Sequence, residues 1–291
     1  LGYTSITIIE GDPQYIAING KPGTVTYGDV DFTLTAAVTT TGGAPVVGGG
    51  AITWASSDPD IASIDDTGKV TVHKAGTTTI TASAAAVPGT YAAGSATLTL
   101  NVGKITLTVD SGTYTVTKVY DGTTNPGTGS GALNVTGVLG GDSGKANVVA
   151  TPPAYTSKAV VANTNLAANL SLTGESAANY QLGSTTISVP CSITKRDITD
   201  VSVTGVTKTY DGDTGAGNAT INGTRTLTGK VAGDNLDITL TVTSFSDANA
   251  GTGKTANITL GALTEADAGN YNLMAASPIT APFIINETTI T

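Results

Sequence analysis

Apolar and polar residues alternate in short runs along the chain, with a repeat of two residues. Residues 30–36 read Val-Asp-Phe-Thr-Leu-Thr-Ala, and residues 238–243 read Ile-Thr-Leu-Thr-Val-Thr. A third run places Ala96, Leu98 and Leu100 on one side of the backbone. A two-residue period is that of a β-strand with one buried face. Because turn-forming glycines separate these runs and no helical period is evident, we predict an all-β fold.

A seven-residue motif occurs twice, and other motifs follow each copy in the same order. Because missing a repeat misreads the whole fold, this periodicity constrains the architecture most strongly. A period of about 90 residues is too long for a solenoid and fits a small domain. The pairs are Lys-Val-Tyr-Asp-Gly-Thr-Thr (118–124) with Lys-Thr-Tyr-Asp-Gly-Asp-Thr (208–214), Gly-Gly-Asp (140–142) with Ala-Gly-Asp (232–234), and Ala-Asn-Tyr-Gln-Leu (178–182) with Gly-Asn-Tyr-Asn-Leu (269–273).

We therefore predict three tandem domains, residues 1–103, 104–194 and 195–291, and call the last two the first repeat and the second repeat. The joints at residues 102–104 and 194–197 contain no Gly/Ser-rich or Pro-rich tether. Short joints limit rotation between domains. The expected assembly is an elongated, semi-stiff rod with few contacts between neighbouring domains.

The first of these segments resembles the group 2 bacterial immunoglobulin-like domain. Four stretches carry the resemblance: Ile-Thr-Trp-Ala-Ser-Ser-Asp (52–58), Ile-Ala-Ser-Ile (61–64), Gly-Lys-Val-Thr (68–71) and Ala-Gly-Thr-Thr-Thr-Ile-Thr-Ala (75–82). The resemblance covers roughly residues 5–103. It implies a β-sandwich of the kind used in bacterial cell-surface and adhesin-type proteins.

The first and second repeats resemble the YDG domain, on the Tyr-Asp-Gly, Gly-Asp and Asn-Tyr motifs quoted above. The resemblance implies domains that occur in tandem in large bacterial surface and filamentous adhesin-like proteins. It also completes the predicted fold class, three tandem Ig-like β-sandwiches. The first repeat has Tyr155-Thr156-Ser157-Lys158 where the second has Phe245-Ser246-Asp247-Ala248. We therefore expect that whatever these residues do is not shared by both copies.

The composition agrees with sandwiches whose exposed faces carry hydroxyl groups. Charged residues make up 12% of the chain and apolar residues 39%, with 37 glycines. The net charge of −9 opposes binding to nucleic acid and to anionic membranes. No apolar run reaches the about 18 residues of a membrane helix, so we predict no membrane insertion. No signal peptide follows Leu1, and we expect a monomeric fragment of a longer protein.

The residues needed for catalysis are scarce. His73 is the single histidine, and alternation with Val70 and Val72 places it toward water. Cys191 is the single cysteine, so neither an internal disulfide nor a cysteine zinc site can form. Pro282 stands at the corresponding place in the second repeat, which indicates that Cys191 is a buried structural residue. We predict no catalytic residue, no cofactor and no metal ligand, and hence no enzyme.

Clustered carboxylates leave two other chemistries open. A glycosidase needs two carboxyl groups across a cleft, and calcium needs several oxygen ligands from loops. The chain has no Asp-x-Asp-x-Asp-Gly loop, and aspartates in β-turns most often bond their own backbone. The favoured interpretation is therefore turn capping. The aspartates concerned are Asp58, Asp60, Asp65 and Asp66, with Asp234 and Asp237 in the second repeat.

The repeated tyrosines have a structural interpretation, with a ligand site as the alternative. In Tyr120-Asp121-Gly122 and its copy at 210–212, the ring packs, the hydroxyl reaches a partner, and glycine permits a positive φ. Tyr180 and Tyr271 resemble anchored tyrosines at the start of a strand. Trp54 is expected in the core. A Lys–Asn isopeptide link between Lys118 or Lys208 and Asn179 or Asn270 is disfavoured, and an intact mass without loss of ammonia would exclude it.

We interpret the chain as a non-enzymatic stalk or adhesion segment of a bacterial cell-surface protein, extracellular or secreted. Its partner would be a host or cell-surface protein or a glycan. One alternative is a carbohydrate- or host-protein-binding module, which predicts a concave patch with exposed Tyr or Trp. A second alternative is an accessory region of a surface polysaccharide-degrading enzyme.

Overall fold

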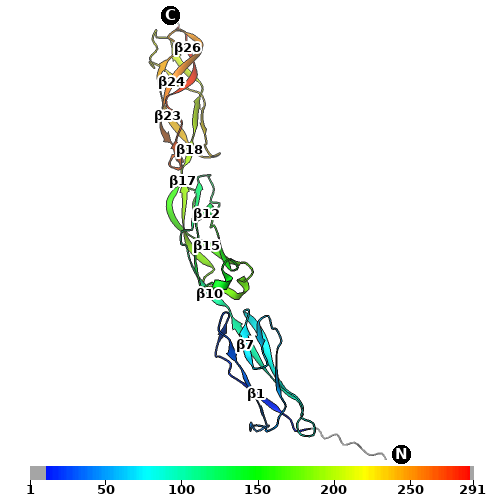
Figure 1. The fold of residues 1–291 in the computed structure, drawn as a ribbon. Helices are drawn as coiled ribbons and strands as arrows, with labels where there is room; N and C mark the ends of the chain where they lie inside the picture. The colour runs from blue at the N-terminus through cyan, green and yellow to red at the C-terminus, as the bar shows by residue number, and fades with distance from the viewer. Residues whose placement is uncertain (1–10, 289–291) are drawn as a thin grey trace, which may run out of the picture. The chain divides into compact units, whose positions relative to one another are not determined.

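A computed structural model describes residues 11–288 (Figure 1). Over these residues the regular structure consists of β-strands and three single-turn 3₁₀ helices. The all-β prediction is confirmed. The chain is rich in threonine and valine, whose branched side chains suit a pleated, half-buried surface. None of the described helices has the length and apolar character needed to cross a membrane.

The described residues divide into two compact units. Unit 1 comprises residues 11–110, 133–150 and 170–187, and unit 2 comprises residues 111–132, 151–169 and 188–288. The division passes through residues 104–194 and does not follow the boundaries expected from the sequence. The three-domain boundaries therefore stay a prediction.

Residues 11–103 form three sheets around one core. The strand orders are β1-β4, β2-β9-β8-β5 and β3-β7-β6. The strands are β1 (Tyr15–Asn19), β2 (Val25–Thr26), β3 (Phe32–Thr33), β4 (Thr35–Thr39), β5 (Ile52–Ser56), β6 (Ala62–Ile64), β7 (Lys69–Val72), β8 (Gly76–Ala84) and β9 (Gly94–Gly103).

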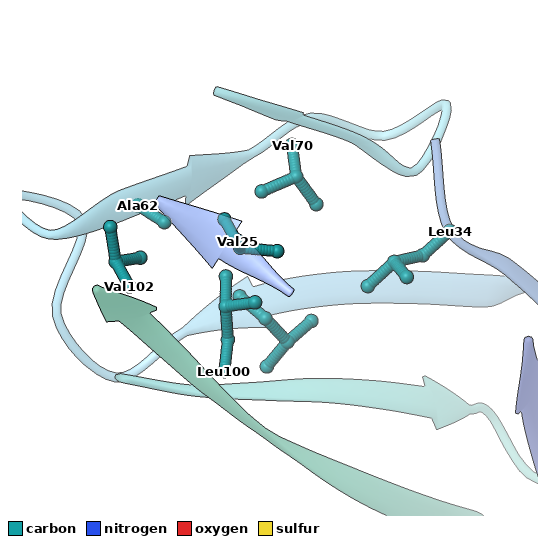
Figure 2. Close-up of a cluster of buried hydrophobic side chains, with 7 residues drawn as sticks. Val25, Leu34, Ala62, Val70, Leu100 and Val102 are labelled. Carbon is teal, nitrogen blue, oxygen red and sulfur yellow. The ribbon is translucent and has the colours of Figure 1, made fainter. Parts of the chain in front are cut away.

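The core of this segment is built from side chains of different sheets. Figure 2 shows Val25, Leu100 and Val102 from the β2-β9-β8-β5 sheet turned toward Ala62 and Val70 from the β3-β7-β6 sheet. All of these side chains are buried. Trp54 is partly buried and packs against this cluster, as expected. Removal of this apolar surface from water, worth about 25 cal/mol per Å², holds the sheets together.

The first repeat contains a three-stranded sheet, β13-β10-β16, and a five-stranded sheet, β12-β11-β17-β15-β14. Its elements are β10 (Ile105–Asp110), β11 (Thr115–Val119), β12 (Thr128–Ser130), β13 (Asn134–Thr136), η1 (Gly140–Asp142), β14 (Asn147–Thr151), β15 (Val161–Thr173), η2 (Ala177–Asn179), β16 (Tyr180–Leu182) and β17 (Thr186–Thr194).

The second repeat has the same five-strand order, β21-β20-β26-β24-β23, together with the pairs β18-β25 and β19-β22. This correspondence shows that the sequence repeat is a repeat of structure. The elements are β18 (Arg196–Ile198), β19 (Asp200–Val203), β20 (Val206–Thr209), β21 (Thr220–Ile221), β22 (Arg225–Thr228), β23 (Asp237–Phe245), β24 (Gly251–Thr264), η3 (Ala268–Asn270), β25 (Tyr271–Leu273) and β26 (Ile279–Asn286).

A short strand that ends just before a tyrosine pairs in parallel with the last strand of its segment in all three cases. The pairs are β2 with β9, β11 with β17 and β20 with β26. The backbone N–H of each tyrosine donates at 2.9 Å to the carbonyl of the residue that ends this last strand. The donor and acceptor pairs are Tyr27 with Gly103, Tyr120 with Thr194 and Tyr210 with Asn286. Each tyrosine is thereby fixed beside the residue from which the chain leaves that segment.

Candidate functional site

Tyr120 of the Tyr-Asp-Gly motif is fully buried, and its hydroxyl partner lies in the following repeat. The hydroxyl donates to Oδ2 of Asp234 at 2.9 Å. Tyr271 donates to the same oxygen at 2.5 Å, and Nζ of Lys158 lies 3.4 Å from Oδ1. The two rings meet edge to face, with centroids 5.4 Å apart. We call Tyr120, Asp234 and Tyr271 the second tyrosine–aspartate cluster.

A matching cluster lies in unit 1, and its first member comes from the segment before the first repeat. The hydroxyls of Tyr27 and Tyr180 donate to Oδ2 of Asp142 at 2.9 and 2.6 Å. Ser176 donates to Oδ1 at 2.7 Å, where Lys158 stands in the other cluster. The tyrosine rings are again edge to face, with centroids 5.9 Å apart. We call Tyr27, Asp142 and Tyr180 the first tyrosine–aspartate cluster.

The turn that carries the aspartate and the strand that carries the second tyrosine hold each other in place. The N–H of Leu139 donates to the Tyr180 hydroxyl at 3.1 Å, and the N–H of Val231 donates to the Tyr271 hydroxyl at 2.9 Å. Tyr180 and Tyr271 are the first residues of β16 and β25. The expectation of anchored tyrosines at the start of a strand is thus confirmed.

An asparagine beside each cluster contacts the main chain of the preceding segment. Oδ1 of Asn179 accepts from the N–H of Ala75 at 2.9 Å. Oδ1 of Asn270 accepts from the N–H of Val160 at 3.0 Å. Because Ala75 and Val160 directly precede the long strands β8 and β15, both asparagines make the same contact.

The glycine that follows Tyr27 or Tyr120 leaves room for the following repeat. Gly28 has φ +86°, and a methyl of Leu139 lies 2.5 Å from the position that a Cβ would occupy. Gly122 has φ +75°, and a methyl of Val231 lies 2.8 Å from the equivalent position. A side chain here would be strained by the positive φ, and its Cβ would press against the methyl group of Leu139 or Val231. Glycine is therefore required by both conformation and close packing.

The clusters hold neutral tyrosines against ionised aspartates. Burial, with the hydrogen bond to Asp234, raises the pKa of Tyr120 to about 12, and burial with Asp142 raises the pKa of Tyr180 to about 12. Burial alone would raise the pKa of Asp142 and Asp234, but the hydroxyl hydrogen bonds outweigh it and the pKa of both is lowered. These groups do not exchange protons near neutral pH, so the arrangement is suited to fastening two segments.

Both clusters join side chains from either side of an expected joint, which the sequence analysis did not anticipate. The structural interpretation of Tyr120 holds, but its hydroxyl partner belongs to the next repeat. Tyr210, in the same motif, is 45% exposed. The Tyr-Gly at residues 27–28 was missed in the sequence because it lacks the lysine and the aspartate of the full motif.

The lysine two residues before each Tyr-Asp-Gly tyrosine fastens the loop that follows it. Nζ of Lys118 donates to Asp121 and to the carbonyl of Thr123, both at 2.8 Å. Lys208 is 1% exposed and contacts Asp211 at 2.7 Å, and it donates to the carbonyls of Asp213 and Gly215. These lysines serve their own loops, whereas Asn179 and Asn270 bond main-chain amides.

The aromatic residue under each of these lysines is shared by the repeats, contrary to expectation. Nζ of Lys118 lies 5.4 Å from the ring centroid of Tyr155, and Nζ of Lys208 lies 5.2 Å from that of Phe245. A ring face attracts a cation whether or not it carries a hydroxyl. The Tyr155 hydroxyl finds acceptors in the carbonyls of Val116 and Ser192. The sequence difference therefore preserves the contact.

The other singled-out residues have separate local partners. His73 is exposed and hydrogen-bonds Ser63 at 2.8 Å, and Cys191 is buried. Asp65 accepts from the N–H groups of Thr67 and Lys69 and so caps a turn. Asp58 does the same for Asp60. Within residues 11–288 no three His, Cys, Asp or Glu side chains gather as metal ligands would.

The YDG domain family matches residues 102–187 and 194–281, which together make up more than half of the sequence. The chain belongs to the YDG domain family. The immunoglobulin-like domain of intimin matches residues 39–86, so the expected order of an Ig-like domain followed by two YDG domains is confirmed. Both matches are to modules of cell-surface proteins, and this YDG chain is a segment of that type.

Among curated proteins, none matches this YDG chain. Solved structures give remote similarities. Surface layer protein SbsC, domains 4–9, is 14% identical to this chain, with a TM-score of 0.25. The similarity covers 94% of this chain and 48% of that structure. The chain thus spans about half of that structure. Mouse cadherin-23 EC22–24 is 15% identical with a TM-score of 0.22, with 96% of this chain and 97% of that chain covered. At these TM-scores neither carries an argument about function.

Replacing Tyr120 by phenylalanine should lower the free energy of unfolding by about 1.5 kcal/mol, the value of a buried hydrogen bond to a charged group. Asp234 would keep its hydrogen bond from Tyr271 and its ion pair with Lys158. Tyr210→Phe is the matched control, because this tyrosine is half exposed, and we expect a change within about 0.5 kcal/mol. Calorimetric unfolding of the parent chain and of the two variants measures both changes. Equal shifts for the two variants would contradict the role of the Tyr120 hydroxyl in the cluster.

Stability should fall below about pH 4. The pKa of Asp142 and of Asp234 is lowered from 3.8 in the folded chain, so their contribution is complete above that value and is lost as pH falls through the folded pKa. The pKa of Asp121 is lowered to about 2, chiefly by the hydrogen bond from Lys118, which extends the loss toward pH 2. Urea unfolding between pH 2 and 6 should show a shallower dependence for the Asp142→Asn/Asp234→Asn double variant. Identical slopes would contradict this account.

Proposed function

We propose that this YDG chain is a non-enzymatic stalk segment of a bacterial cell-surface protein. The observation that supports it is the repetition of one buried tyrosine–aspartate cluster at both joints. Each cluster takes one tyrosine from the preceding segment and an aspartate and a tyrosine from the following repeat. A chain under selection only to hold separate binding domains would not need a fastened joint.

The mechanism is mechanical. Opening a joint would break a charge-assisted hydrogen bond and separate an edge-to-face ring pair, which together contribute about 2–4 kcal/mol. The asparagine-to-amide hydrogen bond and the packing of Leu139 or Val231 on the glycine add contacts that resist rotation of one segment against the next. Stiff joints keep a more distal binding region away from the cell wall and limit the directions in which it can point.

The direct-binding alternative is less well supported. A hollow of about 590 Å³ in the second repeat is lined by charged and polar side chains together with Leu227 and Leu236, and its lining contains no aromatic ring for sugar stacking. Its charges are already engaged, because Arg225 pairs with Asp237 at 2.7 Å and Lys230 donates to the carbonyl of Leu236. A polysaccharide-degrading enzyme with this chain as an accessory region remains the second alternative.

Two measurements on the full chain test the proposal. Dyes on cysteines introduced at the exposed Ser95 and Ser171 would report the first joint by single-molecule energy transfer. We expect a narrow distance distribution that broadens in Asp142→Asn. A broad distribution in both chains would contradict a stiff stalk. Specific binding of the chain to glycans or matrix proteins on an array would instead support the binding module.

A further inference from the structure

The end of the second repeat carries the features that receive a following repeat at the two observed joints. The N–H of Tyr210 bonds the carbonyl of Asn286 at 2.9 Å, in register with Tyr27 and Tyr120 on Gly103 and Thr194. Yet Tyr210 is 45% exposed, whereas Tyr120 is fully buried. The tyrosine is held by the same backbone bond in all three places, and only its surroundings differ.

The glycine after this tyrosine is open where its two counterparts are covered. At Gly28 and Gly122 a methyl of Leu139 or Val231 lies 2.5 or 2.8 Å from the position of a Cβ. Gly212 has φ +81°, and the nearest atom to its Cβ position is the hydroxyl of Tyr210 at 4.0 Å. The backbone therefore has the conformation of the joints without the covering side chain.

The main-chain amide that would meet an asparagine is also in register. Gly76 of β8 pairs with Val102, and Gly251 of β24 pairs with Ile285. Val102 and Ile285 each directly precede the residue whose carbonyl accepts from the tyrosine N–H, Gly103 or Asn286. Ala250 therefore occupies the place of Ala75, whose N–H donates to Asn179. Tyrosine, glycine and amide thus recur together at this end.

We propose that the surface formed by Tyr210, Gly212 and Ala250 is a docking site for a further YDG-type repeat. The occupant supplies a Gly-Asp turn, whose aspartate accepts the Tyr210 hydroxyl, and an Asn-Tyr strand start, whose asparagine accepts from Ala250. An apolar residue three positions before that aspartate, the counterpart of Leu139 and Val231, covers Gly212. This inference goes beyond the stalk function and does not depend on it.

A second copy of this chain is a poor occupant. The Gly-Asp and Asn-Tyr pairs occur together twice in the described residues, and both aspartates are already bonded by a tyrosine from the preceding segment. A second chain would have to open one of its own clusters to offer an aspartate. A separate repeat with an unoccupied aspartate has no such cost.

The test replaces residues 287–291 of the chain with a second copy of residues 195–286, and this variant is called the extended chain. Tyrosine nitration followed by peptide mass spectrometry reports the exposure of each ring. In the original chain Tyr210 should react and Tyr120 should not. In the extended chain we expect the reactivity of Tyr210 to fall to that of Tyr120. Unchanged reactivity, with the added repeat folded by circular dichroism, would overturn the proposal.

Two variants separate docking from other effects. Asn270→Ala in the added copy removes only a contact to the preceding repeat, and we expect partial recovery of nitration at Tyr210. Tyr210→Phe should leave the unfolding midpoint of the original chain unchanged and lower that of the extended chain, and equal midpoint changes would count against the site. Protection of Tyr210 in the original chain on dimerisation, measured by sedimentation, would assign the surface to a second copy and overturn the proposal.

Discussion

Replacing Asp234 by alanine should lower the free energy of unfolding of the second repeat by about 3 kcal/mol, because two buried tyrosine hydroxyls lose their acceptor at once. Tyr120 and Tyr271 both donate to one carboxylate oxygen, and both rings are almost fully buried. The effect should therefore exceed that of Tyr120→Phe, which removes one donor and leaves the acceptor satisfied.

The matched control for this substitution is Asp237→Ala. Asp237 pairs with Arg225 at 2.7 Å, but both side chains are about one-third exposed, and such pairs contribute about 0–1 kcal/mol. Denaturant unfolding followed by tyrosine fluorescence would compare the two variants. Nitration of Tyr120 should increase only in Asp234→Ala. Equal losses in the free energy of unfolding for the two variants would show that the buried cluster contributes no more to stability than an exposed ion pair.

Replacing Lys208 by methionine should destabilise the second repeat by about 2–3 kcal/mol, because breaking a buried ion pair leaves its partners without compensation. The ammonium group serves Asp211, Asp213 and the carbonyl of Gly215 from a fully buried position. Partial exposure of both aspartates keeps the loss below that of a fully enclosed pair. Calorimetry should locate the change in the transition of the second repeat.

Lys74→Met is the control for this change, since Lys74 meets Asp60 at 3.2 Å with both side chains more than half exposed. We expect no measurable change in its unfolding midpoint. The Lys208→Met chain should also lose the order of residues 211–217, seen as faster amide hydrogen exchange there. If exchange in this loop were the same as in the parent, the lysine would not be what fastens it.

Local structure could be predicted from the sequence where period and turns determine it. Alternation placed Val70 in the core and His73 outside, and the structure agrees. The strand starts at Tyr180 and Tyr271 followed from repeated Asn-Tyr pairs. These features depend on neighbours within a few residues, so a short pattern carries the necessary information.

The partner of Tyr120 could not be found in this way, because Asp234 lies 114 residues further along the chain. No periodicity relates two side chains that meet across a joint. The available signal was that the Tyr-Asp-Gly, Gly-Asp and Asn-Tyr motifs recur together. We interpreted each set of motifs as interacting within its own repeat. Comparison of Tyr27 with Tyr120 would have been needed to reveal the relation between copies.

The parallel pairing of the strand before each tyrosine with the last strand of its segment has a consequence for load. When tension is applied through the end of β26, its hydrogen bonds to β20 lie across the direction of pull and are loaded simultaneously. Bonds loaded in shear must yield as a group, whereas the bonds of a peeled hairpin yield one after another. Each repeat should thus rupture abruptly in a single-molecule pulling experiment, with the tyrosine anchored at the point where force enters.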